Sequence, residues 1–112
     1  MNKFYYVYVL QSEKDHKFYV GCTGDIKKRL EEHNNGKVST TKSRRPLKLI
    51  YWEGCLNQQD AASREKYLKT TWGKRYIKSR LKEYIKEQAP TGGPVKMAGR
   101  GIGFVPKGVF SV

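Results

Sequence analysis

The feature that most constrains the fold is a pair of short apolar runs near the start of the chain. The first, 4–10, reads Phe-Tyr-Tyr-Val-Tyr-Val-Leu, and the second, 18–22, reads Phe-Tyr-Val-Gly-Cys. Aromatic and β-branched residues favour strands, and each run is too short for an independent helix. Because the polar segment 12–16 between them is typical of a turn, the sequence predicts an antiparallel β-hairpin whose first strand is covered on both faces.

Helix signals follow the hairpin. Thr23 or Asp25 can cap a helix that ends near Asn34, where Asn35 and Gly36 supply a left-handed stop. The remaining expected segments are a basic Ser/Thr-rich loop at 37–45, a third strand at 47–53, a helix at 58–71, an interruption at Gly73 and a basic helix at 76–87. This order predicts an α+β domain with a small, mainly antiparallel three-stranded sheet flanked by about three helices.

The composition changes after residue 88. The last 24 residues hold six of the eleven glycines and three of the four prolines, which is untypical of regular core structure. We therefore expect a single folded domain at 1–88 and a flexible basic tail at 89–112. A nucleic-acid-binding arm is the functional alternative for the tail.

The charge of the chain indicates its partner. Lys and Arg number 23 against 10 Asp and Glu, a formal charge of +13. Such a surface attracts polyanions, because phosphates neutralised by Lys and Arg release their condensed counterions. No apolar run is long enough to enter a bilayer, so we expect nucleic acid and no membrane as the partner.

The cysteines and the first residues argue against other classes. Cys22 and Cys55 lack the spacing of a zinc site or a disulfide scaffold, and we expect both to be buried thiols. Charged residues follow the first apolar stretch almost at once, unlike a cleavable signal peptide. A cytoplasmic protein is the expectation.

Four residues of the hairpin and first helix could carry chemistry. Tyr8 and Tyr19 each lie on a predicted strand, where a tyrosine is most often a packing residue. Arg29 and His33 are one helical turn apart, beside the helix face that should meet the sheet. There Arg29 could grip a phosphate through its rigid donor fork; the alternative is an arginine extended over a solvated helix.

Glu65 is the candidate metal ligand. It falls in an apolar stripe with helical spacing, formed by Ala61, Glu65, Leu68 and Trp72. A carboxylate in such a stripe needs a counter-charge, which a divalent metal or an arginine would supply. The alternative is a glutamate at the rim of the stripe that pairs with Lys69 at i+4.

These residues together resemble a known family. Tyr6-Val7-Tyr8 and Tyr19-Val20-Gly21, with the later polar residues, look like the GIY-YIG nuclease domain of homing endonucleases and of the excision-repair nuclease UvrC. The second tyrosine lies eleven residues after the first, Arg29 ten further on and His33 four after that, as in the family. The resemblance covers about 3–85 and is greatest to the stand-alone UvrC-like (UPF0213-type) bacterial subgroup.

The resemblance implies a mechanism. A metal-dependent endonuclease would hydrolyse phosphodiester bonds, with Mg²⁺ or Mn²⁺ held by Glu65 and a tyrosinate at Tyr8 or Tyr19 activating water. Arg29 would steady the phosphate, and His33 would orient a tyrosine, contact phosphate or carry a proton. DNA is favoured over RNA, with a role in repair or recombination. We expect a monomer with no small-molecule cofactor.

The chain departs from the family pattern in two places. Tyr6 stands where the family has its initial glycine, and the asparagine that follows the glutamate helix in several active members has no counterpart. The second departure keeps open a non-catalytic nucleic-acid-binding module, and a protein-binding adaptor is a third hypothesis. The residues expected to hold backbone phosphates without reading bases are Lys42, Arg44, Arg45, Lys74, Arg75, Lys78 and Arg80.

Overall fold

The computed structural model describes residues 3–88 and 109–110, and its centre is an antiparallel sheet. The strands are β1 (Tyr5–Ser12), β2 (Phe18–Thr23), β3 (Leu47–Cys55) and the two-residue β4 (Val109–Phe110), in the order β3-β1-β2-β4. β1 and β2 form the predicted hairpin, with Val9 opposite Val20. β1 lies between β3 and β2, and β3 extends two residues beyond the predicted strand.

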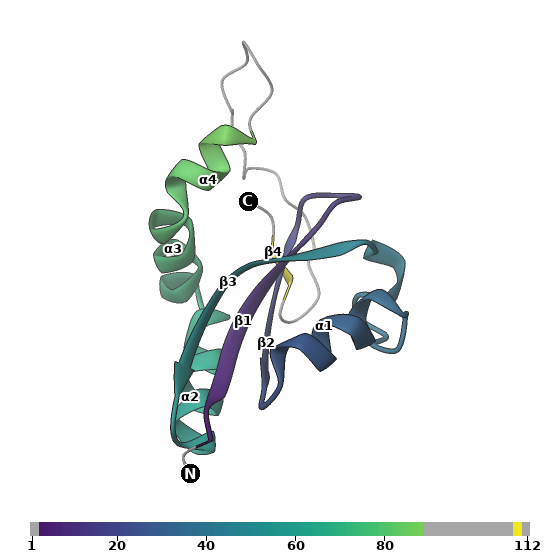
Figure 1. The fold of residues 1–112 in the computed structure, drawn as a ribbon. Coiled ribbons are helices and arrows are strands. Elements are labelled where there is room, and N and C mark those ends of the chain that lie inside the picture. Colours follow the sequence, from purple (N-terminus) through teal and green to yellow (C-terminus); the bar gives the residue numbers. More distant parts are fainter. Residues whose placement is uncertain (1–2, 89–108, 111–112) are drawn as a thin grey trace.

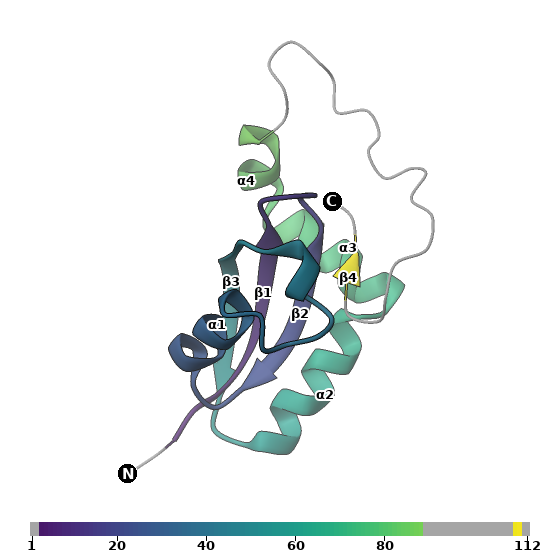
Figure 2. The ribbon, with the colours of Figure 1, turned by 90° about the vertical axis from the view of Figure 1, so that its right-hand side faces the viewer.

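The helices cover both faces of the sheet (Figure 1). They are α1 (Ile26–Asn34), α2 (Gln58–Leu68), α3 (Thr71–Arg80) and the short α4 (Lys82–Glu87), and a 3-10 turn, η1, spans Lys42–Arg44. α1 lies on one side of the sheet, and α2 to α4 lie on the other, as the rotated view also shows (Figure 2). The α+β class with a small antiparallel sheet is therefore confirmed.

The alternation of side chains along β1 divides the interior into two cores. Val7 and Val9 point toward α2 and α3, where they pack with Leu68 and Ile77. On the opposite face, Tyr8 and Leu10 pack with Leu47 of β3, and Leu30 of α1 packs against this cluster. The α1 face therefore encloses the smaller core, and that core contains a tyrosine.

The expected caps of α1 are present. The Asp25 side chain accepts a hydrogen bond from the backbone N–H of Lys28 at 3.0 Å, which satisfies one of the free donors of the first turn. After the helix, Gly36 adopts a φ of 77°, so the predicted left-handed stop is confirmed.

The predicted boundary between the second and third helices is wrong. α2 ends at Leu68, and α3 begins at Thr71 and passes through Gly73. The Thr70 side chain caps α3 by accepting from the N–H of Gly73 at 3.1 Å. A Cβ on Gly73 would lie 2.1 Å from the carbonyl oxygen of Tyr67. The glycine therefore permits a close contact between two helices and does not interrupt a helix.

Two burial predictions also need correction. Trp72 is 65% exposed, because α2 ends before it and the helical phase of the stripe does not continue. Cys22 and Cys55 are free, as expected, but each is partly exposed at the end of its strand.

The predicted tail at 89–112 lies outside the described residues except for β4, which pairs with Phe18 and Tyr19 of β2. Within the described segments, no helix has the length and apolar character needed to cross a bilayer.

Candidate functional site

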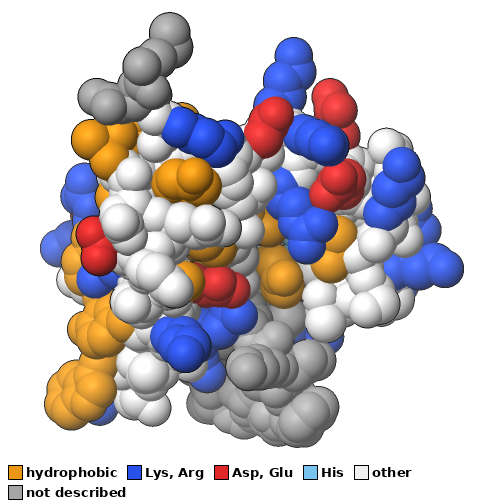
Figure 3. Space-filling model, turned by 90° about the horizontal axis from the view of Figure 1, so that it is seen from below, with side chains coloured by type: hydrophobic (Ala, Val, Ile, Leu, Met, Phe, Trp, Pro, Cys, Tyr) orange, Lys and Arg blue, Asp and Glu red, His pale blue; other side chains and the backbone are white. Residues whose placement is uncertain are grey.

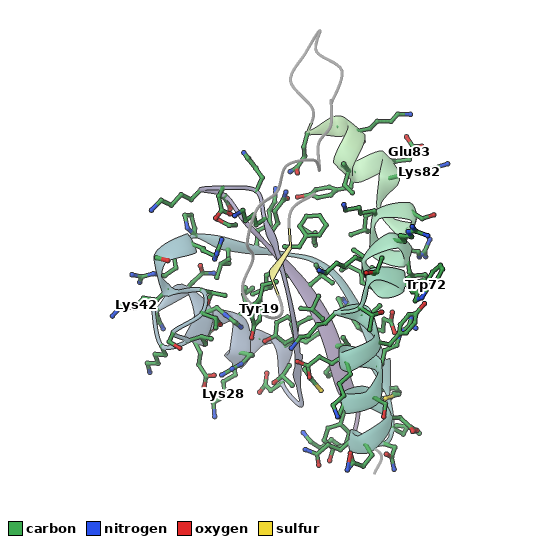
Figure 4. The ribbon with its side chains drawn as sticks, turned by 180° about the vertical axis from the view of Figure 1, so that it is seen from behind. Tyr19, Lys28, Lys42, Trp72, Lys82 and Glu83 are labelled. Atoms are coloured by element: carbon green, nitrogen blue, oxygen red, sulfur yellow. The ribbon has the colours of Figure 1, made fainter. Side chains whose placement is uncertain are left out.

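Four of the five predicted catalytic residues meet on the α1 face of the sheet. Tyr8 projects from β1 and Tyr19 from β2, and their ring centres are 6.4 Å apart. His33 projects from α1, with its ring 5.8 Å from that of Tyr8 and 5.1 Å from that of Tyr19. Figure 4 shows Tyr19 near the middle of the sheet, with α1 on one side and α2 to α4 on the other.

A chain of hydrogen bonds leads inward from Tyr8. The Tyr8 hydroxyl lies 2.9 Å from Nε2 of His33, and Nδ1 of His33 lies 2.8 Å from Oγ1 of Thr41. Thr41 donates its hydroxyl proton to the carbonyl of Val38 at 3.4 Å. Because its proton is used there, Thr41 accepts from Nδ1–H of His33, which leaves Nε2 to accept from the Tyr8 hydroxyl. We call Tyr8, His33 and Thr41 the relay.

The relay is removed from solvent. Tyr8 is 2% exposed, and His33 and Thr41 are fully buried. Burial, reinforced by the positive charge of Arg29, lowers the pKa of His33 to about 4, so its imidazole is neutral at physiological pH. Burial raises the pKa of Tyr8, and an interaction with the Arg29 guanidinium partly opposes that rise. The resting relay therefore holds a protonated phenol beside a neutral imidazole.

Gly21 gives the Tyr8 ring its position. The two residues are partners across the β1–β2 ladder. A Cβ on Gly21 would lie 2.4 Å from the Tyr8 hydroxyl oxygen and 2.5 Å from the ring carbon that carries it. Only glycine leaves room for this ring to cross β2 and reach α1.

Arg29 lies at the mouth of the site. Its guanidinium donates to Oε1 of Glu32 at 2.8 Å, and this contact is the main reason that the pKa of Arg29 is raised. Its side chain is 36% exposed and lines a surface hollow of about 380 Å³. Lys3, Lys28, Arg29 and the turn at 23–25 contribute to the lining of this hollow, which we call the arginine groove.

Glu65 approaches from the opposite side of the sheet. Its carboxylate accepts from Nζ of Lys69 at 2.8 Å, so the pairing considered from the i+4 spacing is present. Glu65 nevertheless lies close enough to contribute to raising the pKa of both Tyr8 and Cys22. Cys22 also lines the arginine groove. The Glu65 carboxylate is thus paired with a lysine, and its charge acts on Cys22, a residue that lines the groove.

The residues near the groove fit one kind of metal site. Within the described part of the chain, no cluster of three or more His, Cys, Asp or Glu side chains could enclose a cation. Mg²⁺, however, commonly binds one or two carboxylates and completes its shell with water and substrate phosphate. The single carboxylate of Glu65 fits that mode. To bind the metal, it would have to break its ion pair with Lys69.

The predicted phosphate-binding residues form two separate groups. Lys42 and Arg45 are exposed beyond α1, whereas Arg44 is bound to Asp15 at 2.6 Å. The α3 group lies across the sheet from α1 and contains Lys74, Arg75, Lys78 and Arg80. In that group the guanidinium of Arg75 lies 5.1 Å from the centre of the Trp72 ring. Only the first group is on the same side of the sheet as the relay.

Sequence reasoning missed three residues of the site. Thr41 orients His33, but a threonine in a Ser/Thr-rich loop carries no periodic signal. Lys3 and Lys28 flank Arg29 in the groove. Lys28 directly precedes Arg29 in a basic run at the start of α1, and that run was the available signal.

Comparison with known proteins identifies the class. The GIY-YIG catalytic domain matches residues 4–78. This segment contains the predicted catalytic residues Tyr8, Tyr19, Arg29, His33 and Glu65. The chain therefore belongs to the GIY-YIG family, whose catalytic domain is of the nuclease type.

Several proteins of one group are similar to the chain. The UPF0213 protein CPE1444 of Clostridium perfringens is 38% identical over 84 residues, which cover 74% of this chain and 89% of the relative. The UPF0213 protein YazA of Bacillus subtilis is 38% identical over 95 residues, covering 80% and 93%. A UPF0213 protein of Syntrophus aciditrophicus is 44% identical over 66 residues, covering 57% and 75%. No solved structure matches the chain.

Proposed function

We propose that this protein is a metal-dependent endonuclease that hydrolyses phosphodiester bonds in nucleic acid, with DNA favoured over RNA and repair or recombination as the setting. The observation that carries the proposal is the relay beside Arg29: a phenol, a neutral imidazole and an orienting hydroxyl in one hydrogen-bonded chain. An activated base held by a third group is the usual arrangement for proton removal in hydrolysis.

The relay supplies a route for the proton of the attacking water. The Tyr8 oxygen takes a proton from water while its own proton passes to Nε2 of His33, which lies 2.9 Å from that oxygen and later returns the proton to solvent through Tyr8. The resulting hydroxide forms the new bond to phosphorus as the bond to the leaving sugar oxygen breaks, and solvent protonates that oxygen. Thr41 holds the imidazole so that Nε2 faces Tyr8 throughout. This assigns the base to Tyr8, leaving Tyr19 to pack against His33.

Arg29, and a metal ion held by Glu65, would stabilise the negative charge that develops on the phosphate. The guanidinium is permanently charged and borders the groove, where it would bind the phosphate as charge builds up on it. Glu65 would hold Mg²⁺ or Mn²⁺, which when bound supplies Lewis-acid polarisation of the phosphoryl oxygen. Lys69 would then release the carboxylate. The surface of this half of the molecule offers cations for the role: Figure 3 shows Lys and Arg side chains, with Asp and Glu side chains among them, over the side formed by α1.

The first test removes one hydroxyl. With Mg²⁺ or Mn²⁺, and with supercoiled, branched and single-stranded DNA and RNA as substrates, Tyr8→Phe should lower the cutting rate roughly 100- to 10,000-fold, the usual contribution of a general base. Tyr51→Phe is the control, because Tyr51 is a partly buried tyrosine outside the relay whose hydroxyl is also hydrogen-bonded, to Glu53 and Tyr76. Equal rates for both variants would refute the assignment of Tyr8.

The second test concerns the metal ligand. Glu65→Gln should abolish metal-dependent cutting, whereas Glu83→Gln should not, because Glu83 is a helical glutamate paired with a lysine on the distant α4. Cutting that survives Glu65→Gln would exclude this residue as the metal ligand. Arg29→Ala should also reduce cutting, since it removes the fixed charge beside the phosphate. Tight binding without cutting by the wild type would favour the non-catalytic module instead.

A further inference from the structure

A second hollow adjoins the arginine groove on the same face of the sheet. Its volume is about 550 Å³, and it shares Gly24 and Asp25 with the groove. The side chains that shape the rest of it are Tyr6, Ile26, Lys27, Leu30, Leu49 and Trp52. Apart from Lys27 these side chains are apolar or aromatic. We call this hollow the aromatic pocket.

Exposed aromatic rings form its wall. Trp52 of β3 is 54% exposed and meets Tyr6 edge to face, with ring centres 5.4 Å apart. Phe4, which is 47% exposed and outside the lining of the pocket, stacks on Tyr6 with ring centres 6.3 Å apart. Trp52 lies directly opposite Tyr8 in the β1–β3 ladder. The pocket is therefore next to the relay. Tyr6 stands where the family motif has glycine, and it therefore adds a ring that the motif itself does not supply.

The charge around the pocket selects its occupant. Lys27 lines the pocket, and Lys3 and Lys28 line the adjoining groove. The two carboxylates of the lining are already engaged, because Asp25 caps α1 and Glu32 pairs with Arg29. A ligand that spans both hollows should therefore combine a flat apolar group with an anion. A nucleotide has this combination, because its base stacks on aromatic rings while its phosphate meets lysine or arginine. The pocket volume is also within the range of about 300–1,000 Å³ typical of small-ligand sites.

We propose that the aromatic pocket binds an unpaired nucleobase next to the phosphate held in the arginine groove. This inference rests on the proposed function and adds a substrate class to it. Bases inside a duplex are stacked on their neighbours and cannot enter a side pocket without being extruded. The protein therefore acts on nucleic acid with at least one unpaired nucleotide beside the bond to be cut.

The two tryptophans of the chain allow a direct binding test. Trp72→Phe leaves Trp52 as the only tryptophan, and a base stacked on it should quench its fluorescence. The probes are a 12-nucleotide oligothymidine and a 12-base-pair blunt duplex, both in EDTA so that no cutting occurs. The oligothymidine should quench Trp52, and the duplex should quench it much less. Equal quenching by the two probes, or none by either, would overturn the proposal.

Affinity gives an independent measure. Trp52→Ala should weaken oligothymidine binding roughly 5- to 150-fold, the effect of losing one base–aromatic stack, and should leave duplex binding unchanged. Trp52→Phe keeps a ring and should restore most of the affinity. Trp72→Ala is the matched control, because Trp72 is more exposed, at 65%, and projects from α3 away from the sheet (Figure 4). Comparable losses from Trp52→Ala and Trp72→Ala would contradict a specific pocket.

Failure of this inference is distinguishable from failure of the proposed function. Quenching and Trp52-dependent affinity without metal-dependent cutting would retain the pocket and reject the nuclease. Cutting that proceeds with unchanged oligothymidine affinity in Trp52→Ala would retain the nuclease and reject the pocket.

Discussion

At the scale of the residue, the site depends on one buried imidazole. His33 is fully buried and has a hydrogen-bond partner on each ring nitrogen. Neither partner is a carboxylate, and the negative charge of Glu32 offsets only part of the effect of burial and of the Arg29 charge on the ring. The low pKa of His33 therefore follows from its buried position. This lowered pKa also makes the stability of the fold depend on pH.

The stability of the fold should fall in mild acid because of His33. In the unfolded chain the imidazole takes up a proton near its ordinary pKa of 6.5, whereas in the folded protein it does so only near about 4. Its contribution is therefore complete above pH 6.5 and is lost as the pH falls toward 4. The loss reaches about 3 kcal/mol at most. Circular dichroism melts between pH 8 and 4 would measure it.

A substitution identifies the responsible histidine. His33→Gln removes the titrating group, so its melting temperature should depend less on pH over this interval than that of the wild type. The other histidine, His16, lies exposed in the β1–β2 turn with a φ of 62°. His16→Asn suits that backbone and should keep the wild-type dependence. An unchanged slope in His33→Gln would show that other groups cause it.

At the scale of the element, the junction of α2 and α3 holds the two helices in contact. Thr70 caps α3, and Gly73 in its first turn packs onto the last turn of α2. Leu68 and Ile77, on either side of this junction, both reach the larger core. The junction thus sets where α3 lies relative to the sheet.

Gly73→Ala separates helix propensity from tertiary packing. Propensity alone predicts that alanine stabilises a helix by about 1 kcal/mol over glycine. The structure predicts the opposite sign, because the new methyl would lie 2.1 Å from the backbone oxygen of Tyr67. We expect a loss of roughly 1–3 kcal/mol or more, as for overpacked cores, measured by urea unfolding.

A second glycine substitution is the control. At Gly24 the nearest atom to a new Cβ is Nζ of Lys3, at 3.0 Å, and this side-chain end can move aside. Gly24→Ala should therefore cost much less stability than Gly73→Ala. A Gly73→Ala protein as stable as the wild type would mean that the two helices are farther apart than described.

At the scale of the whole molecule, the positive charge is divided by the sheet. Lys3, Lys28 and Arg29 surround the groove on the α1 side, and Figure 4 shows Lys28 and Lys42 projecting outward there. The basic residues of α3 lie on the opposite side. A straight nucleic-acid segment cannot contact both sides of the sheet at once. A segment bound in the groove would therefore contact only the basic residues of the α1 side.

The salt dependence of binding tests this division. If Lys28 contacts one phosphate, Lys28→Ala should reduce the slope of log affinity against log salt by about 0.7–0.9. Lys86→Ala, on α4, should leave the slope unchanged, because Lys86 lies far from the groove and faces Glu83 at 3.6 Å. A slope close to zero for the wild type would favour the adaptor hypothesis.

The local structure and the class of the protein can be predicted from the amino-acid sequence. The hairpin, the Asp25 cap and the third strand follow from short-range patterns, since strand alternation and capping depend on neighbouring residues. The spacing of Tyr8, Tyr19, Arg29 and His33 also indicated the family before any fold was known. These features require no knowledge of which segments meet.

Features that depend on contacts between distant parts of the sequence follow from the tertiary structure alone. Thr41 completes the relay because its loop folds back onto α1, and Gly73 lies inside a helix because α3 packs against α2. Trp52 and Tyr6 form a pocket wall because β3 pairs with β1. Such contacts arise when elements pack together, and no local pattern of residues encodes which side chains will then meet.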